Sequence, residues 1–175
     1  MIRWLVYLLI IGRTKICVTN ISKKNTDYEL FIDTNIFIEY FEKRQHFESV
    51  RLLFNALEDG IHTGYISTGS FYTLAYIVDQ GFKRKGYDRL ERLDFVRSVL
   101  LGVLNLVTVI EIDNTTLRKG INDYLFTDLE DSFQYQVSLT HQCDMLITLN
   151  TKDFKGADSS FVQIITPQQF VEEYL

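Results

Sequence analysis

Residues 29–35 read Glu-Leu-Phe-Ile-Asp-Thr-Asn (ELFIDTN), and this short segment indicates the architecture of the whole chain. Three apolar residues that end in an acid, Asp33, are typical of a short buried strand. Thr34 and Asn35 can cap a helix that we expect over Ile36 to Lys43. A buried strand that leads directly into a helix is the first half of a βα unit, which predicts a parallel sheet.

The same alternation continues along the chain. Besides residues 29–33, we expect strands at His62 to Ser67, Leu106 to Ile112, Met145 to Leu149 and Gln163 to Ile165. We expect helices at Phe47 to Leu57, from a Ser67 cap to about Asp79, at Tyr87 to Leu104, at Asn114 to Asn122, at Asp128 to His141 and at Pro167 to Leu175, with a basic loop at Gly81 to Gly86. The sequence therefore predicts an α/β fold with a parallel sheet that is covered on both faces.

Length and composition exclude several classes of protein. The chain has 175 residues, the size of one ordinary domain, and its 46% hydrophobic content excludes a mainly disordered protein. Its net charge of −5 excludes a globally basic nucleic-acid binder, but not an enzyme that neutralises phosphate locally with metal ions. Cys17 and Cys143 match neither a disulfide framework nor a zinc site, so we expect reduced thiols in a cytoplasmic protein.

Residues 1–27 differ from the rest, and we expect an amino-terminal extension and linker there, ahead of one domain at 28–175. The first segment carries a net charge of +4, whereas residues 28–175 carry −9. Its apolar run, Trp4 to Ile11, is too short to span a membrane, which takes about 20 residues. Three interpretations stay open: an extension upstream of the functional start, an export signal, or an apolar segment lying on the protein surface.

Polar residues follow the predicted strands at the edge where open α/β sheets carry their sites. Asp33 ends the first strand, Asn150 ends the fourth, and Asp153 comes three residues later. Glu130 and Asp131 lie near the start of a predicted helix. Carboxylates that converge without matched Lys or Arg repel one another, and an oxygen-only ligand set selects Mg²⁺ or Mn²⁺. Such a site suits the hydrolysis of phosphodiesters.

Each of these residues also has a plain structural interpretation. Asp33 and Asp128 can act as helix N-caps, and Glu130 and Asp131 can simply favour a helix start. Asp153 can be an ordinary loop acid. The basic run that contains Lys83, Arg84 and Lys85 can be a solvated face or can hold a polyanion backbone.

Four segments taken together resemble the PIN domain, the nuclease domain of VapC-type toxins. They are residues 30–35 (LFIDTN), 128–135 (DLEDSFQY), 143–154 (CDMLITLNTKDF) and 165–170 (ITPQQF). No single segment is specific, but their order and spacing are, and the resemblance spans about 28–175. It implies a three-layer α/β/α sandwich with a mainly parallel sheet, Mg²⁺- or Mn²⁺-dependent ribonuclease activity, frequent homodimerisation and, in many members, a small antitoxin partner.

Position by position, the resemblance implies that Asp33, Asp131 and Asp153 are the catalytic, metal-binding acids. Asn35 matches a polar residue that supports the first acid, and Asn150 matches the site at the end of the final strand of the motif.

The sequence departs from the family at two places. The usual helix Glu aligns with Thr73, which can support the site but supplies no full negative charge, so we expect weaker metal affinity. The usual Thr-Arg-Asn turn is Thr148-Leu149-Asn150, which lacks the Arg. Glu130 is a possible substitute carboxylate, but helix neighbours lie about 100° apart, so we expect it to point away from the direction of Asp131.

Two classes of function remain. The first is a metal-dependent endoribonuclease that hydrolyses RNA, the toxin of a toxin–antitoxin pair, whose −9 domain suits a basic antitoxin segment. The second is a catalytically weak PIN-like module that binds RNA or a protein partner. Thr73 favours the second, with Lys83, Arg84 and Lys85 as contacts to the RNA backbone. A phosphatase with Asp33 as nucleophile fits poorly, because Asn35 stands where a second acid is needed.

Overall fold

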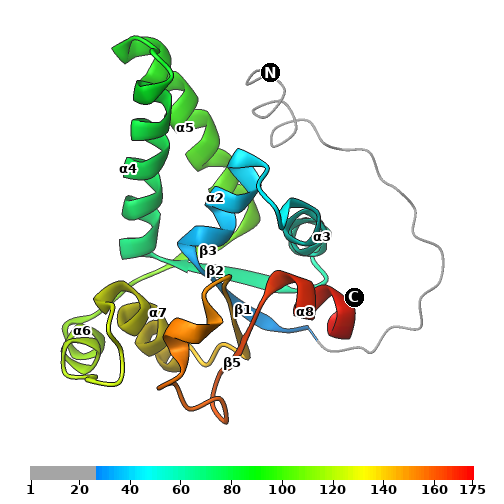
Figure 1. Ribbon diagram of the computed structural model, residues 1–175, viewed down its shortest axis with the longest axis vertical. Helices are drawn as coiled ribbons and strands as arrows, with labels where there is room; N and C mark the ends of the chain where they lie inside the picture. Colours follow the sequence, from blue (N-terminus) through cyan, green and yellow to red (C-terminus); the bar gives the residue numbers. More distant parts are fainter. Residues whose placement is uncertain (1–26) are drawn as a thin grey trace.

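The computed structural model describes residues 27–175 (Figure 1). The predicted extension at 1–27 therefore lies outside the described residues, apart from Asp27. The sheet in the middle of the molecule has five strands, and every neighbouring pair is parallel. In spatial order the strands are β3 (Thr108–Ile110), β2 (Thr63–Ser67), β1 (Glu29–Ile32), β4 (Met145–Ile147) and β5 (Gln163–Ile165). All five predicted strands are present, and the α/β prediction is confirmed.

Alternating side chains of the central strand divide the core between the two faces of the sheet. Leu30 and Ile32 point into the larger hydrophobic cluster, and Phe31 points into a second cluster on the other face. All three side chains are fully buried. A strand buried on both faces explains why residues 30–32 are a continuous apolar run.

Seven α-helices of the described residues flank this sheet. The larger cluster is covered by α2 (Thr34–Glu42), α3 (Phe47–Glu58), α4 (Thr68–Arg84), α5 (Arg89–Leu106) and α8 (Pro167–Tyr174). The other face is covered by α7 (Leu129–Thr140), against which α6 (Asn114–Ile121) packs, and by the 3-10 helix η1 (Thr151–Phe154). Figure 1 shows this division, with α6 and α7 on the opposite side of the sheet from α2 and α3. The predicted layers are confirmed.

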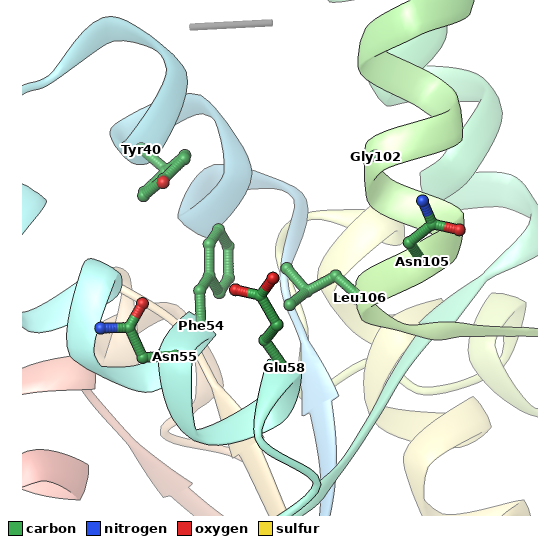
Figure 2. Close-up of a pocket in the computed structure, with 7 residues that line it drawn as sticks. All are labelled: Tyr40, Phe54, Asn55, Glu58, Gly102, Asn105 and Leu106. Carbon is green, nitrogen blue, oxygen red and sulfur yellow. The ribbon is translucent and has the colours of Figure 1, made fainter. Parts of the chain in front are cut away.

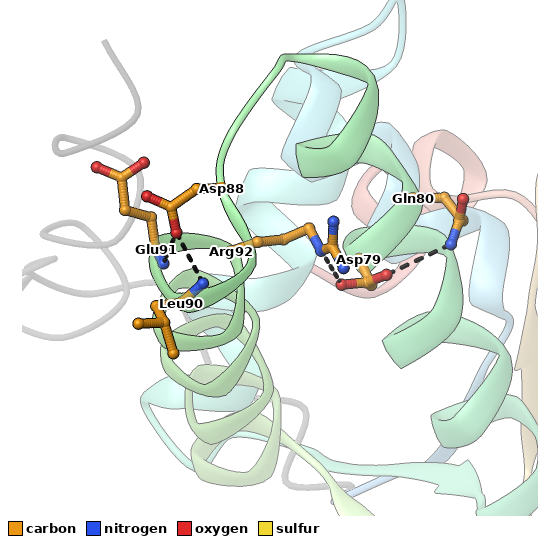
Figure 3. A network of polar contacts seen from close by, with 6 residues as sticks. All are labelled: Asp79, Gln80, Asp88, Leu90, Glu91 and Arg92. Atoms are coloured by element: carbon orange, nitrogen blue, oxygen red, sulfur yellow. Dashed lines mark hydrogen bonds and ion pairs between the residues drawn. The ribbon is translucent and has the colours of Figure 1, made fainter.

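Helices α4 and α5 form a hairpin that extends beyond the sheet (Figure 1). The predicted end at Asp79 is wrong, because α4 continues to Arg84 and absorbs most of the predicted loop at Gly81 to Gly86. Arg92 of α5 pairs with Asp79 of α4 at 2.6 Å (Figure 3), and Phe82 packs on Phe95 of α5. These contacts between α4 and α5 stabilise the last turns of α4, which the local sequence alone does not favour.

Candidate active site

Asp33 lies at the carboxyl end of β1, where it is the N-cap of α2. Its backbone N–H donates to the carbonyl of Ile147 in β4 at 3.0 Å, and its carboxylate accepts from the backbone N–H of Asn35 at 3.2 Å. The side chain is only 4% exposed. The capping interpretation is thus confirmed, and the same position buries a carboxylate at the edge of the sheet.

Three polar side chains hold the Asp33 carboxylate in place. Thr148 donates from its hydroxyl to Oδ2 at 2.6 Å, and the Asn35 amide donates to the same oxygen at 2.5 Å. Gln134 of α7 donates from Nε2 to Oδ1 at 3.2 Å. Burial raises the pKa of Asp33, while these hydrogen bonds oppose the rise by favouring the charged form. The carboxylate is therefore oriented by residues from three separate segments.

The first turn of α7 brings further carboxylates to the same place. Asp128 caps the helix, accepting from the backbone N–H of Glu130 at 2.7 Å. Burial, and then the charge of Asp33, raise the pKa of Glu130, whose carboxylate also accepts from the Thr34 hydroxyl at 3.4 Å. The pKa of Asp131 is raised to about 7, first by burial and then by the charges of Asp33, Asp128, Asp153 and Glu130.

No basic side chain offsets these acids in the part of the chain that the structure describes. All four ion pairs within residues 27–175 lie elsewhere, between Arg44 and Glu42, Arg51 and Glu48, Arg92 and Asp79, and Arg97 and Asp94. A bound cation would lower the electrostatic repulsion between these carboxylates.

The donor chemistry of this edge fits a divalent ion. Its side chains offer carboxylate, amide and hydroxyl oxygens, which Mg²⁺ and Mn²⁺ prefer, and no thiolate or imidazole. Within residues 27–175, no three Asp, Glu, His or Cys side chains converge closely enough to form a ready-made metal site. Binding an ion would therefore require rotation of these exposed or half-buried acids toward one another.

Two further predicted residues lie in the connection after β4. Asn150 donates from its backbone N–H to the Thr148 hydroxyl at 3.0 Å, so it belongs to the network around Asp33. Asp153 lies in η1, where its backbone N–H donates to the Asn150 carbonyl at 2.9 Å and its charge acts on Asp131. The connection thus places Asp153 near the acids of α7.

The three basic residues predicted to contact the RNA backbone do not lie at this site. Lys83, Arg84 and Lys85 lie at the far end of α4, ten or more residues beyond Thr73. At 1.5 Å per residue, that is about 15 Å along the helix axis. A role for them would require an RNA chain that extends well past the acids.

A cavity of about 200 Å³ opens beside the acids. It is lined by Ser67, Gly69, Ser70, Thr73, Ile112, Glu130, Phe133 and Gln134. Thr73, the position of the expected helix acid, therefore shares this cavity with Glu130. We expected Glu130 to point away from the direction of Asp131. Glu130 lines this cavity and Asp131 is not among its lining residues, which agrees with that expectation. The first turn of α7 thus presents Glu130 toward the start of α4, beside Thr73.

Sequence reasoning missed two residues that contact Asp33. Gln134 follows Glu130 by four positions, so the two share a helix face, and this spacing was the available signal. Glutamine is seldom fully buried, yet Gln134 is 2% exposed. Thr148 stands out in the sequence only as part of a turn, because its contact with Asp33 depends on the pairing of β1 with β4.

A second hollow, of about 50 Å³, lies near the opposite edge of the sheet (Figure 2). It is lined by Tyr40, Phe54, Asn55, Glu58, Gly102, Asn105 and Leu106. Glu58 ends the helix before β2, and Leu106 ends the helix before β3, so both precede the amino ends of strands. The hollow is small and has a single carboxylate, so the first site remains the candidate.

Comparison with known protein families matches residues 29–152 to the PIN domain. Two solved structures share the fold. One, a toxin–antitoxin complex from Klebsiella pneumoniae, has 23% identity and a TM-score of 0.52, and the match covers 79% of this chain and 97% of that one. The other, VapBC2 from Rickettsia felis bound to a promoter DNA fragment, has 18% identity and a TM-score of 0.56, with 77% and 97% covered. A search of curated proteins found no match. Within residues 27–175, no helix is long and apolar enough to cross a membrane.

Proposed function

Because the chain belongs to the PIN domain family, we propose that it is a metal-dependent endoribonuclease that hydrolyses phosphodiester bonds of RNA. The observation that carries this proposal is the buried Asp33 carboxylate, which Thr148, Asn35 and Gln134 orient at the carboxyl end of β1. The raised pKa of Asp131, about 7, supports it, because burial and the charges of Asp33, Asp153 and Glu130 are among its causes. Like charges gathered at the carboxyl edge of a parallel sheet, without a basic partner in residues 27–175, suit a cation and a phosphate substrate.

Asp33, Asp131 and Asp153 would hold Mg²⁺ or Mn²⁺, and Glu130 would supply the carboxylate that Thr73 lacks. A divalent ion contributes activation of water and stabilisation of the charge that develops on the leaving oxygen. Thr148, Asn35 and Gln134 are positioning residues in this scheme, since each donates a hydrogen bond to Asp33. Asn150 supports Thr148 through its backbone N–H.

The proposed biological role is that of a toxin restrained by a small antitoxin. It is supported by the fold that this chain shares with two solved structures. One is a toxin–antitoxin complex, and the other is a VapBC2 complex bound to promoter DNA. The charge of −9 on residues 28–175 suits a basic antitoxin segment. A homodimer in the cytoplasm is part of the same proposal.

The experiment that tests the nuclease is RNA cleavage by the full chain with Mn²⁺, Mg²⁺ or EDTA. Asp33→Asn is the decisive variant, because Asn is as good an N-cap as Asp and the change removes the charge, and one of the two accepting oxygens, while keeping the size of the side chain. We expect metal-dependent cleavage that falls by roughly 100-fold or more in this variant, since even outer-shell partners of metals contribute 10–100-fold.

The matched control is Asp94→Asn, which removes a carboxylate that is exposed on α5. It should cleave RNA as the wild type does. Absence of cleavage with every metal, together with equal RNA binding by wild type and Asp33→Asn, would refute the nuclease. That result would favour the alternative of a catalytically weak binding module, for which Thr73 in place of an acid is the supporting observation.

A further inference from the structure

The cavity between α4 and α7 has features that the proposed metal site does not use. Of its lining residues, only Glu130 is a proposed metal-binding acid and only Gln134 contacts Asp33. The proposed metal site leaves Ser67, Gly69, Ser70, Ile112 and Phe133 unused. The cavity is continuous with the acids through Gln134, which lines it and also donates to Asp33. A substrate group next to the reacting phosphate would therefore meet this cavity.

Gln134, which lines the cavity, has an unsatisfied acceptor. Its Nε2 donates to Asp33, which determines the orientation of the amide, and its Oε1 is buried with no hydrogen-bond partner among residues 27–175. A buried carbonyl oxygen without a donor costs free energy, and such groups are commonly satisfied by water or by a ligand. The side chain is 2% exposed, so bulk solvent does not supply that donor.

The remaining walls combine two hydroxyls with apolar surface. Ser70 accepts a hydrogen bond from the Ser67 hydroxyl at 2.9 Å, which leaves its own hydroxyl hydrogen available. Thr73 adds a second hydroxyl, and Ile112 and Phe133 supply apolar atoms. These walls suit a partly apolar ring that carries an N–H donor for the Gln134 acceptor and acceptor atoms for the hydroxyls.

The volume suits a ligand with one ring. A cavity of about 150 Å³ encloses a benzene molecule, so 200 Å³ accommodates one six-membered ring with its substituents. A fused two-ring base needs more room, so we expect it to fit less well. We propose that this cavity binds the base of one pyrimidine nucleotide of the RNA substrate, beside the phosphodiester bond that is cut. This inference rests on the proposed function.

Free nucleosides test the cavity without metal or cleavage, because they carry no phosphate. We expect cytidine and uridine to shift the amide resonances of Ser70, Thr73, Phe133 and Gln134 in the full chain. Adenosine should bind at least roughly 10-fold more weakly than cytidine or uridine, which is the discrimination that a shaped pocket gives.

Gly69→Leu provides a variant that places an apolar side chain at the cavity wall, at a position where the backbone accepts a Cβ. A Cβ at Gly69 would meet Ile112 Cδ1 at 3.5 Å and Ser67 Oγ at 3.7 Å, which are ordinary contacts with two lining residues. Gly81→Leu is the matched control on the same helix, because a Cβ there has nothing within 4 Å. We expect Gly69→Leu to weaken pyrimidine binding by about 10-fold or more, and Gly81→Leu to leave it unchanged.

Cleavage separates this inference from the proposed function. On RNAs that differ at one position, wild type should favour a pyrimidine there and Gly69→Leu should lose the preference. Pyrimidine binding without cleavage would support the cavity and refute the nuclease. Cleavage without nucleoside binding or base preference would overturn the cavity inference alone. Equal binding of adenosine, or binding of only water or Mn²⁺ in the cavity, would also overturn it.

Discussion

Thr148 donates a hydrogen bond of 2.6 Å to the carboxylate of Asp33 across 115 residues of sequence. Both side chains are buried, and each stands at the carboxyl end of its strand. The Thr148 hydroxyl also accepts hydrogen bonds from the Asn35 amide at 3.1 Å and from the backbone N–H of Asn150 at 3.0 Å. One hydroxyl thus joins two strand ends and orients the acid on which the proposed activity depends.

Thr148→Val should therefore lower activity and raise the pH at which activity appears. Val keeps the shape but donates no hydrogen bond, so the pKa of Asp33, already raised by burial, rises further. We also expect a loss of about 1–3 kcal/mol in the free energy of unfolding, the cost of an unsatisfied buried polar group. Denaturant unfolding and the pH profile of RNA cleavage measure the two effects.

The control for that change is Thr140→Val, near the end of α7, where the Thr hydroxyl bonds only within its own helix and to Thr116. It should leave the pH profile unchanged. A Thr148→Val protein with the wild-type pH profile would show that the hydroxyl does not tune Asp33.

Asp131→Asn should stabilise the metal-free protein at neutral and alkaline pH. The carboxyl has a pKa of about 7 in the folded chain against an ordinary value of 3.8. Between these values the folded chain keeps a proton that the unfolded chain has released, so the stability that the proton provides is lost as pH rises through about 7. The variant should therefore melt above the wild type at about pH 8 in EDTA, and close to it at about pH 4.

Added Mn²⁺ should reverse this order. An ion that binds only the folded protein stabilises it by an amount that grows with the logarithm of its affinity, and the variant lacks one proposed ligand. Asp94→Asn, at an exposed position, should melt as the wild type does in both conditions. The proposed assignment of Asp131 fails if the Asn variant gains no stability in EDTA at about pH 8.

Glu130→Gln should weaken Mn²⁺ binding, and Thr73→Glu should restore it in the same chain. Both positions line one cavity beside Asp33, so a carboxylate at either position can serve as the additional metal ligand. We expect roughly 10–100-fold weaker Mn²⁺ binding in the single variant, measured by calorimetry on the full chain. If Thr73→Glu fails to recover affinity while the fold is intact, Glu130 does not compensate for Thr73.

Local signals allowed much of the fold to be predicted from sequence. The run Leu30 to Ile32 ends in an acid, and a short apolar run with a following cap needs no distant partner to be recognised. The length of α4 could not be predicted, because the contacts of Asp79 with Arg92 and of Phe82 with Phe95 depend on the packing of α5. Local glycines alone favoured a loop there.

Some residues of the candidate site could likewise be predicted from local sequence, and others could not. Asp33 and Asp131 stand out because acids at a strand end and a helix start follow patterns of sequence. Gln134 and Thr148 contact Asp33 only because α7 and β4 pack beside β1, and a buried glutamine or threonine has no distinctive local pattern. The direction of Glu130 likewise depends on where α7 lies, which helical periodicity alone does not give.

His62 should make the protein less stable in mild acid. Its ring lies between those of Tyr28 and Phe170, at centroid distances of 5.5 and 5.3 Å. Its Nδ1 accepts from the backbone N–H of Tyr28 at 3.3 Å, and its Nε2 has no hydrogen-bond partner among residues 27–175. Burial lowers the pKa of His62 below its ordinary value of 6.5, because a charged ring would lose its hydration.

Below pH 6.5 the unfolded chain binds a proton that the folded chain excludes, so the free energy of unfolding falls as pH drops toward the lowered pKa. His62→Asn keeps an acceptor for Tyr28 and cannot be protonated, so its stability should change less between about pH 7 and pH 5, even though lost packing lowers its absolute value. The exposed His141, changed to Asn, should keep the wild-type slope. Denaturant unfolding at several pH values measures the slopes, and equal slopes in His62→Asn and wild type would show that this histidine does not set the acid limit of the fold.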